Sequence, residues 1–149
     1  MNKKLRTDGS IKAIYGFRNE TKLVRPLIGP RIPAGFPSPA QDYLEGSIDL
    51  NQHLIQHPAS TCFLRVDGYS MVGAGIHPDD ILILDRSLDA TSNRIIVAIY
   101  DGELTVKRLR IEGDQYYLCP ENPEFPVIQV STDLDFLVWG VVTYVIRKV

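Results

Sequence analysis

The sequence predicts a compact, mostly β domain with short helical turns and an extended N-terminal arm. Three observations carry this prediction. Short segments with alternating or continuous apolar residues follow one another closely from residue 61 onward, as is typical of an all-β domain. Asp101-Gly102, the strongest two-residue hairpin signal, separates two of these segments. The residues before about position 39 show little periodicity and end in a proline-rich stretch, which predicts an extended arm.

Six strands are expected from these patterns. In residues 61–67, Cys62, Leu64 and Val66 alternate on one face, as in a half-buried strand. Gly113-Asp114 predicts a second turn. The expected strands cover residues 61–67, 81–85, 95–100, 103–111, 116–119 and 137–146. At 149 residues the chain is long enough for one domain with a real core, but not for two.

Composition excludes several classes of protein. The chain is 44% hydrophobic and 23% charged, which is ordinary for a soluble globular protein. No apolar run approaches the ~18–20 residues of a membrane span, and no apolar segment follows the basic N-terminus as a signal peptide requires. Cys62 and Cys119 are too few for a disulfide scaffold and lack metal-type spacing. The expectation is a cytoplasmic protein with reduced thiols, no cofactor, no metal and no membrane contact.

The formal net charge of −2 is an average over two unlike parts of the chain. Residues 1–34 hold eight basic and two acidic side chains, a charge of +6. The remaining 115 residues hold eight basic and sixteen acidic side chains, a charge of −8. This asymmetry is compatible with a tail that has its own role or with a solvated leader. Because an acidic body repels a polyanion, no strong direct DNA binding is expected.

The second half of the arm is unsuited to a helix. Residues 25–39 contain five prolines and two glycines in fifteen positions, which also disfavours a central strand. Such a segment is extended and exposed. It is therefore either a chain that can enter a protease site or a plain linker.

The best helix candidate covers residues 41–56. One short turn is expected within residues 39–45. Asp49 is expected to cap a second turn from Leu50 to Gln56, which Pro58 ends.

Gly68-Tyr69-Ser70-Met71 is the first candidate for catalytic chemistry. The motif ends a predicted strand and precedes a glycine-rich turn, so Ser70 can point out of the sheet while nearby backbone N–H groups remain free for an oxyanion. Most serines in turns, however, only bond their own backbone. No pattern ties His53, His57 or His77 to Ser70, so a Ser-His-Asp triad is unsupported.

Lysine is the other base that serves a serine nucleophile, and Lys107 lies inside a predicted strand. Alternation places it on one face with Thr105, Leu109 and Ile111, while the neighbouring arginines face the other way. Apolar surroundings favour the neutral amine, which is the form that accepts a proton. Thr105 is placed to hold that amine by a hydrogen bond. Alternation leaves one alternative open, a strand lysine whose ammonium extends to solvent.

Four motifs follow one another along the chain. They are Ala34-Gly35, Gly68-Tyr69-Ser70-Met71, Asp79-Asp80-Ile81-Leu82-Ile83-Leu84-Asp85 and Thr105-Val106-Lys107-Arg108-Leu109. In this order, with 37 positions from Ser70 to Lys107, they resemble the LexA/UmuD family of self-cleaving Ser-Lys peptidases. Residues 35–43 and 48–51 resemble the UmuD branch in particular. The resemblance covers roughly residues 27–149.

The resemblance implies the roles of individual residues. Ser70 is the implied nucleophile and Lys107 the implied general base of a serine peptidase, a hydrolase that cuts its own Ala34-Gly35 bond. The backbone N–H groups of Tyr69 and Ser70 are implied to bind the oxyanion. The supporting residues are Thr105 and Met71.

The resemblance also implies a domain division and partners. Residues 35–149 would form a LexA/UmuD C-terminal-like β domain for catalysis and dimerisation, and self-cleavage would remove the arm of residues 1–34. UmuD-type proteins act in the SOS response to DNA damage, where a RecA filament on single-stranded DNA stimulates their cleavage. The cleaved homodimer then joins a UmuC-type Y-family DNA polymerase in error-prone translesion synthesis.

Two alternatives of the same fold remain at this point. One is a LexA-like or phage-type regulator, which the 34 residues before Gly35 disfavour because they are too few for a helix-turn-helix domain. The other is a non-catalytic polymerase-binding module. Two residues depart from the family pattern: Tyr69 stands where a polar residue is common, and Pro33 directly precedes Ala34.

Overall fold

The computed structural model shows two compact units, each described here by itself. It describes residues 6–18, 24–28 and 44–149. The larger unit comprises Met1–Phe17 with Ala59–Val149, and the smaller unit comprises Arg18–Pro58.

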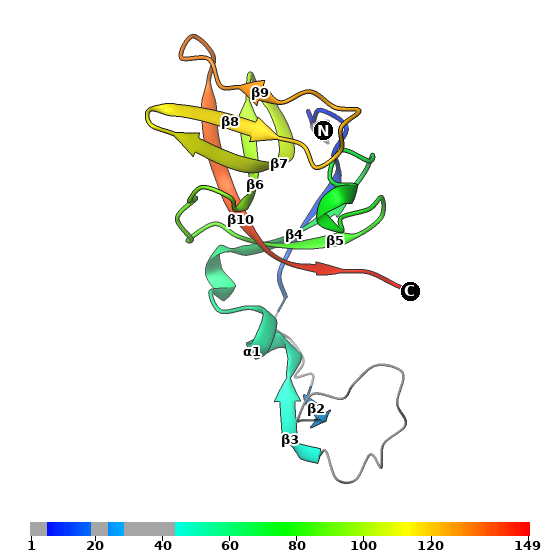
Figure 1. The fold of residues 1–149 in the computed structure, drawn as a ribbon. Coiled ribbons are helices and arrows are strands. Elements are labelled where there is room, and N and C mark those ends of the chain that lie inside the picture. The colour runs from blue at the N-terminus through cyan, green and yellow to red at the C-terminus, as the bar shows by residue number, and fades with distance from the viewer. Residues whose placement is uncertain (1–5, 19–23, 29–43) are drawn as a thin grey trace, which may run out of the picture. The chain divides into compact units, whose positions relative to one another are not determined.

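An eight-stranded antiparallel sheet makes up the larger unit (Figure 1). In sheet order the strands are β1 (Ile11–Gly16), β4 (Thr61–Val66), β5 (Ile81–Asp85), β10 (Phe136–Ile146), β6 (Ile95–Tyr100), β7 (Glu103–Glu112), β8 (Gln115–Cys119) and β9 (Ile128–Gln129). The first half of β10 pairs with β6 and its second half pairs with β5, with a register irregularity in each pairing. This long strand therefore joins the two parts of one curled sheet, and the mostly-β fold class is confirmed.

The segment before β1 brings the two distant parts of this sheet together. Thr7 forms a parallel bridge with Leu104 of β7, and β1 then pairs with β4. Ile11 is buried and Ile14 packs against the same core. Sequence analysis predicts an extended arm here, because the high charge of residues 1–34 obscures the short apolar pattern of residues 11–16. Within that predicted arm, the structure shows β1 as a strand of the sheet.

The strands predicted from residue 61 onward agree with the structure to within about one residue at each end. The hairpin between β6 and β7 has the predicted turn. Asp101 has φ 49° and Gly102 has φ 78°, and this pair of left-handed residues is what a type I′ turn requires. The residues that were expected to alternate in β4 also do so, since Leu64 and Val66 are buried in the core.

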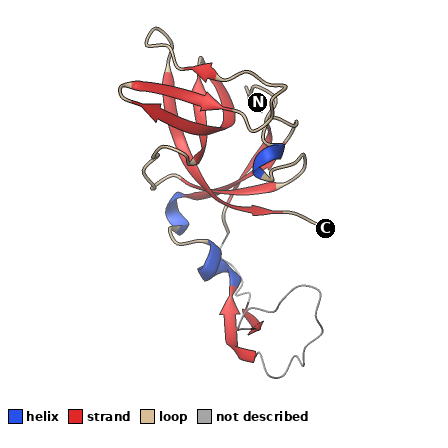
Figure 2. Cartoon of the chain, viewed as in Figure 1, coloured by secondary structure: helices blue, strands red, loops and turns tan. Residues whose placement is uncertain are grey.

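Among its described residues, the smaller unit holds two paired strands and a short helix (Figure 2). Strand β2 (Val24–Ile28) pairs antiparallel with β3 (Leu44–Asp49), and α1 (Leu50–Leu54) follows directly. Asp49 Oδ1 accepts the N–H of Asn51 at 3.0 Å, so the predicted cap is confirmed.

Two helical expectations for this unit need correction. The helix that Asp49 caps ends at Leu54 and not at Gln56. The helical turn predicted within residues 39–45 is wrong at Leu44 and Glu45, which belong to β3. Pro26 lies within β2, which is possible because both strands of a two-stranded sheet are edges. The predicted cleavage residues Ala34 and Gly35 lie outside the described residues, so the division into residues 1–34 and 35–149 stays a prediction.

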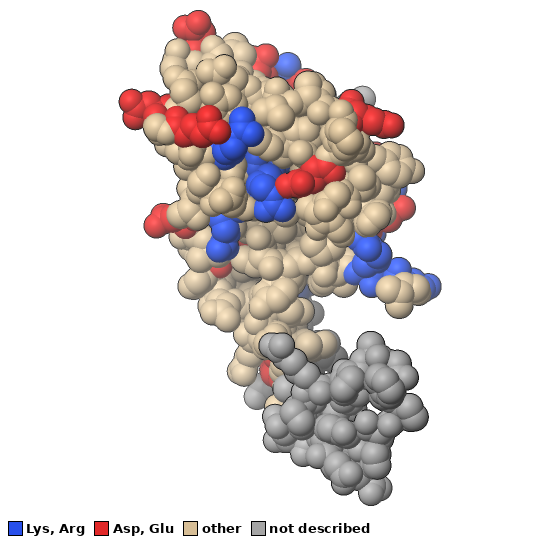
Figure 3. Space-filling model, in the orientation of Figure 1, with Lys and Arg blue, Asp and Glu red and all other residues tan. Residues whose placement is uncertain are grey.

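Charged side chains of both signs are interspersed on the face of the larger unit seen in Figure 3. On β7, Arg108 pairs with Glu121 and Arg110 pairs with Glu112. None of the helices among the described residues is long and apolar enough to cross a membrane.

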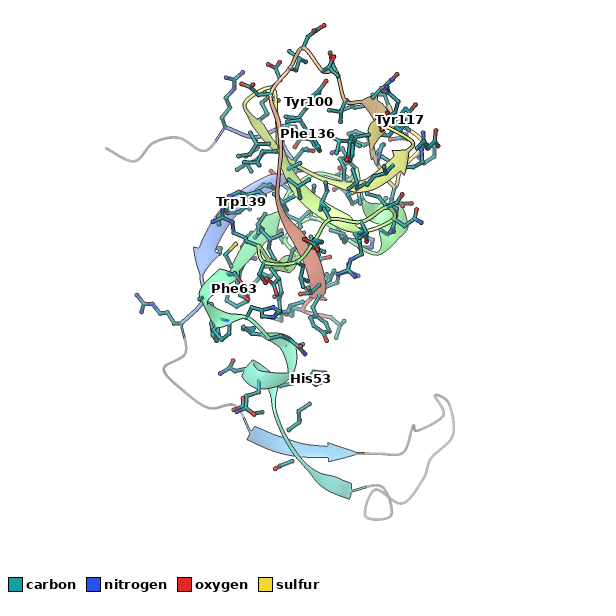
Figure 4. The ribbon with its side chains drawn as sticks, turned by 90° about the vertical axis from the view of Figure 1, so that its left-hand side faces the viewer. His53, Phe63, Tyr100, Tyr117, Phe136 and Trp139 are labelled. Atoms are coloured by element: carbon teal, nitrogen blue, oxygen red, sulfur yellow. The ribbon has the colours of Figure 1, made fainter. Side chains whose placement is uncertain are left out.

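Two apolar clusters lie against the sheet. Successive side chains of β6 point to opposite faces of the sheet and so contribute to both clusters. Val97 belongs to the first cluster, and Ile96 and Ala98 belong to the second. The first cluster is centred on buried residues of β4, β5, β6 and β7, and the second includes Leu109 and Leu118. Tyr100 and Phe136 lie edge to face at 6.3 Å between ring centroids, beside the second cluster (Figure 4). Burial of each large apolar side chain contributes about 1.5–3 kcal/mol to the stability of the fold. Strand β7 carries three such buried side chains, Leu104, Val106 and Leu109, which fix its position in the sheet.

Candidate active site

Ser70 lies in the loop that follows β4. Gly68, with φ 72°, turns the chain out of the strand, and a 3-10 helix at Val72–Ala74 follows. Ser70 is buried, although its side chain lines a small hollow. Among the described residues, no acceptor takes the backbone N–H of Tyr69 or Ser70. The expected role of these two groups in binding an oxyanion stays a prediction.

A second loop, after β8, holds the Ser70 loop by its backbone. The N–H of Glu121 donates to Ser70 O at 2.8 Å, and the N–H of Gly73 donates to Glu121 O at 2.7 Å. The Asn122 side-chain amide donates to Tyr69 O at 2.9 Å. Sequence reasoning missed these supports, because no local pattern joins residues about 50 positions apart.

Lys107 lies on β7 and only 4% of it is exposed. The alternative of an ammonium extended to solvent is therefore wrong. Nζ donates to Thr105 Oγ1 at 2.8 Å, to Val106 O at 3.0 Å and to Asp8 Oδ2 at 3.1 Å. The contact with Thr105 is the one that alternation predicts.

Asp8 is the residue that sequence analysis missed. Its carboxylate accepts hydrogen bonds from the Ser10 N–H at 3.0 Å, from Ser10 Oγ and from Thr105 Oγ1, in addition to the Lys107 ammonium. Asp8 lies 99 positions before Lys107, and nothing near it in the sequence marks it as a site residue.

The charge of Asp8 is maintained by these contacts. Burial by itself raises the pKa of Asp8, but the Lys107 ammonium and the hydrogen bonds from Ser10 and Thr105 outweigh it and lower the pKa below the usual 3.8. Because the folded-state pKa is depressed, the stabilisation by Asp8 is complete above the ordinary value. It is lost only as the pH falls through the still lower folded-state value.

The hollow beside Ser70 has a volume of about 70 Å³. Residues 8–10 line one side, residues 67–70 line another, and Phe125 completes it. Ser70 and Asp8 thus face the same hollow, and Asp8 in turn binds Lys107. Ser70 is not among the acceptors of Lys107 Nζ in the part of the chain that the structure describes.

Other motif residues have structural contacts. Asp80 is buried and takes two hydrogen bonds from Arg147 and one from the backbone N–H of His77. The Arg147 hydrogen bond is the main cause of the lowered pKa of Asp80.

Met71, the residue after Ser70 in the same loop, is buried in the first apolar cluster. Residues 6–18, 24–28 and 44–149 contain no group of three His, Cys, Asp or Glu side chains placed to hold a metal ion.

Comparison with known proteins gives consistent matches. Residues 26–143 match the family described as Peptidase S24-like. The chain is 44% identical over 120 residues to protein MucA of Salmonella typhimurium, which covers 80% of this chain and 82% of MucA. It is 43% identical over 127 residues to protein ImpA of Shigella flexneri, and this match covers 84% of this chain and 85% of ImpA. It is 39% identical over 142 residues to the LexA repressor of Acidithiobacillus ferrooxidans, which covers 93% of this chain and 68% of that repressor.

Proposed function

Because the chain belongs to the Peptidase S24-like family, we propose that it is a serine peptidase that cuts its own Ala34-Gly35 bond. The resemblance to the LexA/UmuD family that its motifs predict is confirmed by these matches. Ser70 is the proposed nucleophile and Lys107 the proposed general base.

One observation carries the proposal. The hollow at Ser70 is lined by Tyr69 and Ser70, whose backbone N–H groups have no acceptor among the described residues, and a buried lysine is joined to that hollow through Asp8. Backbone N–H groups that are already oriented stabilise the negative charge of a tetrahedral intermediate, at about 2.7–4 kcal/mol for one donor. A buried lysine supplies a base once it has lost its proton.

The proposed reaction has two stages. Ser70 Oγ attacks the carbonyl carbon of Ala34 while its proton moves to the neutral amine of Lys107. The oxyanion is held by the N–H groups of Tyr69 and Ser70. The C–N bond then breaks, the Lys107 ammonium protonates the new amine of Gly35, and an ester to Ser70 remains. Water, deprotonated by Lys107, hydrolyses that ester and regenerates the Ser70 hydroxyl.

The biological role that we propose follows the UmuD-type relatives. Cleavage is stimulated by a RecA filament on single-stranded DNA during the SOS response. The shortened homodimer acts with a UmuC-type Y-family polymerase in translesion synthesis. The similarity to MucA and ImpA over more than four-fifths of each relative supports this role over that of a repressor, because the LexA match covers a smaller share of its relative.

Incubation of the purified full-length protein at alkaline pH tests the activity. A fragment that begins at Gly35 is expected, because an amine acts as a general base only in its neutral form, which alkaline pH favours. Ser70→Ala abolishes cleavage, and Lys107→Ala slows it at least ~100-fold, the usual contribution of a general base. The readout is the amount of fragment over time, with N-terminal sequencing of the product.

The matched controls are Ser131→Ala and Lys148→Ala, which change residues outside the hollow. Both are expected to cleave like the parent protein. Cleavage that persists in Ser70→Ala, or that occurs at another bond, contradicts the proposal. A chain that stays intact at every pH favours the non-catalytic polymerase-binding module.

A further inference from the structure

The N-terminal segment Arg6–Ser10 occupies the open edge of β7 beside the proposed base. Strand β8 pairs with β7 only from Arg108 onward, so the part of the β7 edge before it is left open by β8. Asp8 N donates to Leu104 O at 3.0 Å, and Leu104 N donates to Arg6 O at 3.1 Å. Farther along, the N–H of Val106 donates to Ser10 Oγ at 3.0 Å. The segment is thus held along the edge as far as Val106, the residue before Lys107.

Three acceptors surround Lys107 Nζ in this arrangement: Thr105 Oγ1, Val106 O and Asp8 Oδ2. A lysine ammonium has three protons to donate and no lone pair. Three acceptors therefore satisfy the ammonium completely, and one of them is a charged carboxylate. A general base needs the opposite state, a neutral amine with a free lone pair toward the serine hydroxyl.

The other titratable groups around Lys107 do not replace Asp8. Strand β6 places the apolar Ile96 opposite Lys107 in the sheet register. On the Ser70 loop, Asp67 and Tyr69 line the hollow. The carboxylate of Asp67 accepts the N–H of Gly68 at 2.9 Å, so its hydrogen bond stabilises the turn in which it lies and does not involve Lys107. Among the described residues, Asp8 is the one carboxylate bonded to Lys107.

The same segment restricts access to Ser70. Asp8–Ser10 form one wall of the hollow, whose volume of about 70 Å³ leaves little room beside the serine. A peptide carbonyl must approach within about 3–3.5 Å of the attacking oxygen in a reactive geometry. A substrate strand and Arg6–Ser10 therefore compete for the space beside Ser70.

We propose that Asp8 is a positioning residue that keeps Lys107 in its ammonium form, so that self-cleavage is suppressed until Arg6–Ser10 leaves the edge of β7. This inference rests on the proposed function. When the segment leaves, Lys107 loses its one charged acceptor, its proton passes to water or hydroxide, and the amine becomes able to accept the Ser70 proton. The vacated edge and hollow become open to the substrate strand at the same time.

Asp8→Asn in the full-length protein tests this proposal. The substitution keeps the size of the side chain but removes the charge that favours the ammonium. An opposite charge at this distance typically shifts a titration by one unit or more. The pH–rate profile of self-cleavage is therefore expected to move to lower pH, and cleavage at a fixed pH on its rising limb becomes about tenfold faster. Asp8→Ala changes the profile in the same direction.

Asp79→Asn is the matched control. It also removes one carboxylate that contacts the N-terminal part of the chain, since Asp79 pairs with Lys12 on β1. Its φ of 69° suits asparagine as well as aspartate. Its pH–rate profile is expected to match that of the parent protein. If Asp8→Asn has the parental profile, or cleaves more slowly while it remains folded, the proposal is overturned although the proposed function stands.

A readout independent of cleavage separates the two proposals. In the Ser70→Ala background, the side-chain NMR signal of isotope-labelled Lys107, assigned with Lys107→Arg, is followed against pH. The signal is expected to change at a lower pH in Asp8→Asn than in the protein with Asp8. This result supports the inference about Asp8 even if no variant cleaves itself. Identical titrations with and without Asp8 overturn it whether or not the protein is a peptidase.

Discussion

Lys107 lies in the middle of strand β7, whereas Ser70 lies in the loop between β4 and β5. Strand register with β6 and the buried Leu109 hold this proposed base in place. The loop of the proposed nucleophile is instead held from another loop: Glu121 donates its N–H to Ser70 O and accepts the N–H of Gly73, and the Asn122 amide donates to Tyr69 O. From this difference we expect substitutions in β7 around Lys107, the strand side, to lower mainly the stability of the fold. Substitutions in the two loops around Ser70 and Glu121, the loop side, are expected to lower the rate of self-cleavage more than the stability.

The largest expected effect is the loss of stability when a buried side chain of β7 is truncated. Leu109 is fully buried in the second cluster, two positions from Lys107 on the same face. Leu109→Ala removes this packing and leaves a cavity, which lowers the free energy of unfolding by about 2–5 kcal/mol. Chemical denaturation measures the loss. Leu137→Ala, at a residue that is 58% exposed, is the control and changes stability by about 0.5 kcal/mol or less. Similar losses in both variants would contradict the assigned core.

An intermediate effect is expected on the loop side. A Cβ at Gly73 would lie 2.5 Å from Glu121 O, so Gly73→Ala forces the two loops apart. The overpacking costs about 1–3 kcal/mol of stability. Because these loops hold Ser70, we expect self-cleavage to fall further than the loss of folded protein explains.

The control for this substitution is Gly16→Ala. A Cβ there meets no atom within 4 Å and the backbone has no left-handed φ. Thermal unfolding and the cleavage rate are measured on both variants. A cleavage rate in Gly73→Ala that follows the folded fraction alone would show that the contact between the loops does not position Ser70.

The smallest expected effect lies at the turn between β7 and β8, away from both proposed catalytic residues. Gly113 has φ 59° and open space around it, so Gly113→Ala adds only backbone strain of about 1 kcal/mol. The melting temperature falls slightly, and the cleavage rate of the folded protein stays unchanged. A marked loss of cleavage would mean that the far end of β7 takes part in placing Lys107.

Much of the fold follows from local patterns in the sequence. The six strands expected from residue 61 onward, the Asp101-Gly102 hairpin and the Asp49 cap each depend on neighbours within a few positions, whereas the two-residue strand β9 (Ile128–Gln129) was not predicted. The face of Lys107 follows from period-two alternation on β7 in the same way. The paired strand β3 was missed, because its partner β2 contains a proline and lies sixteen or more positions before it.

The sequence by itself determined the mostly β class, the family and the two candidate catalytic residues, because each is encoded in short motifs or in their order along the chain. Tertiary structure alone decided how the N-terminal segment sits on β7. The contact of Asp8 with Lys107 spans 99 positions, and that of Asn122 with Tyr69 spans 53. Such contacts depend on the curl of the sheet and on how its loops meet, and no local periodicity records either of them.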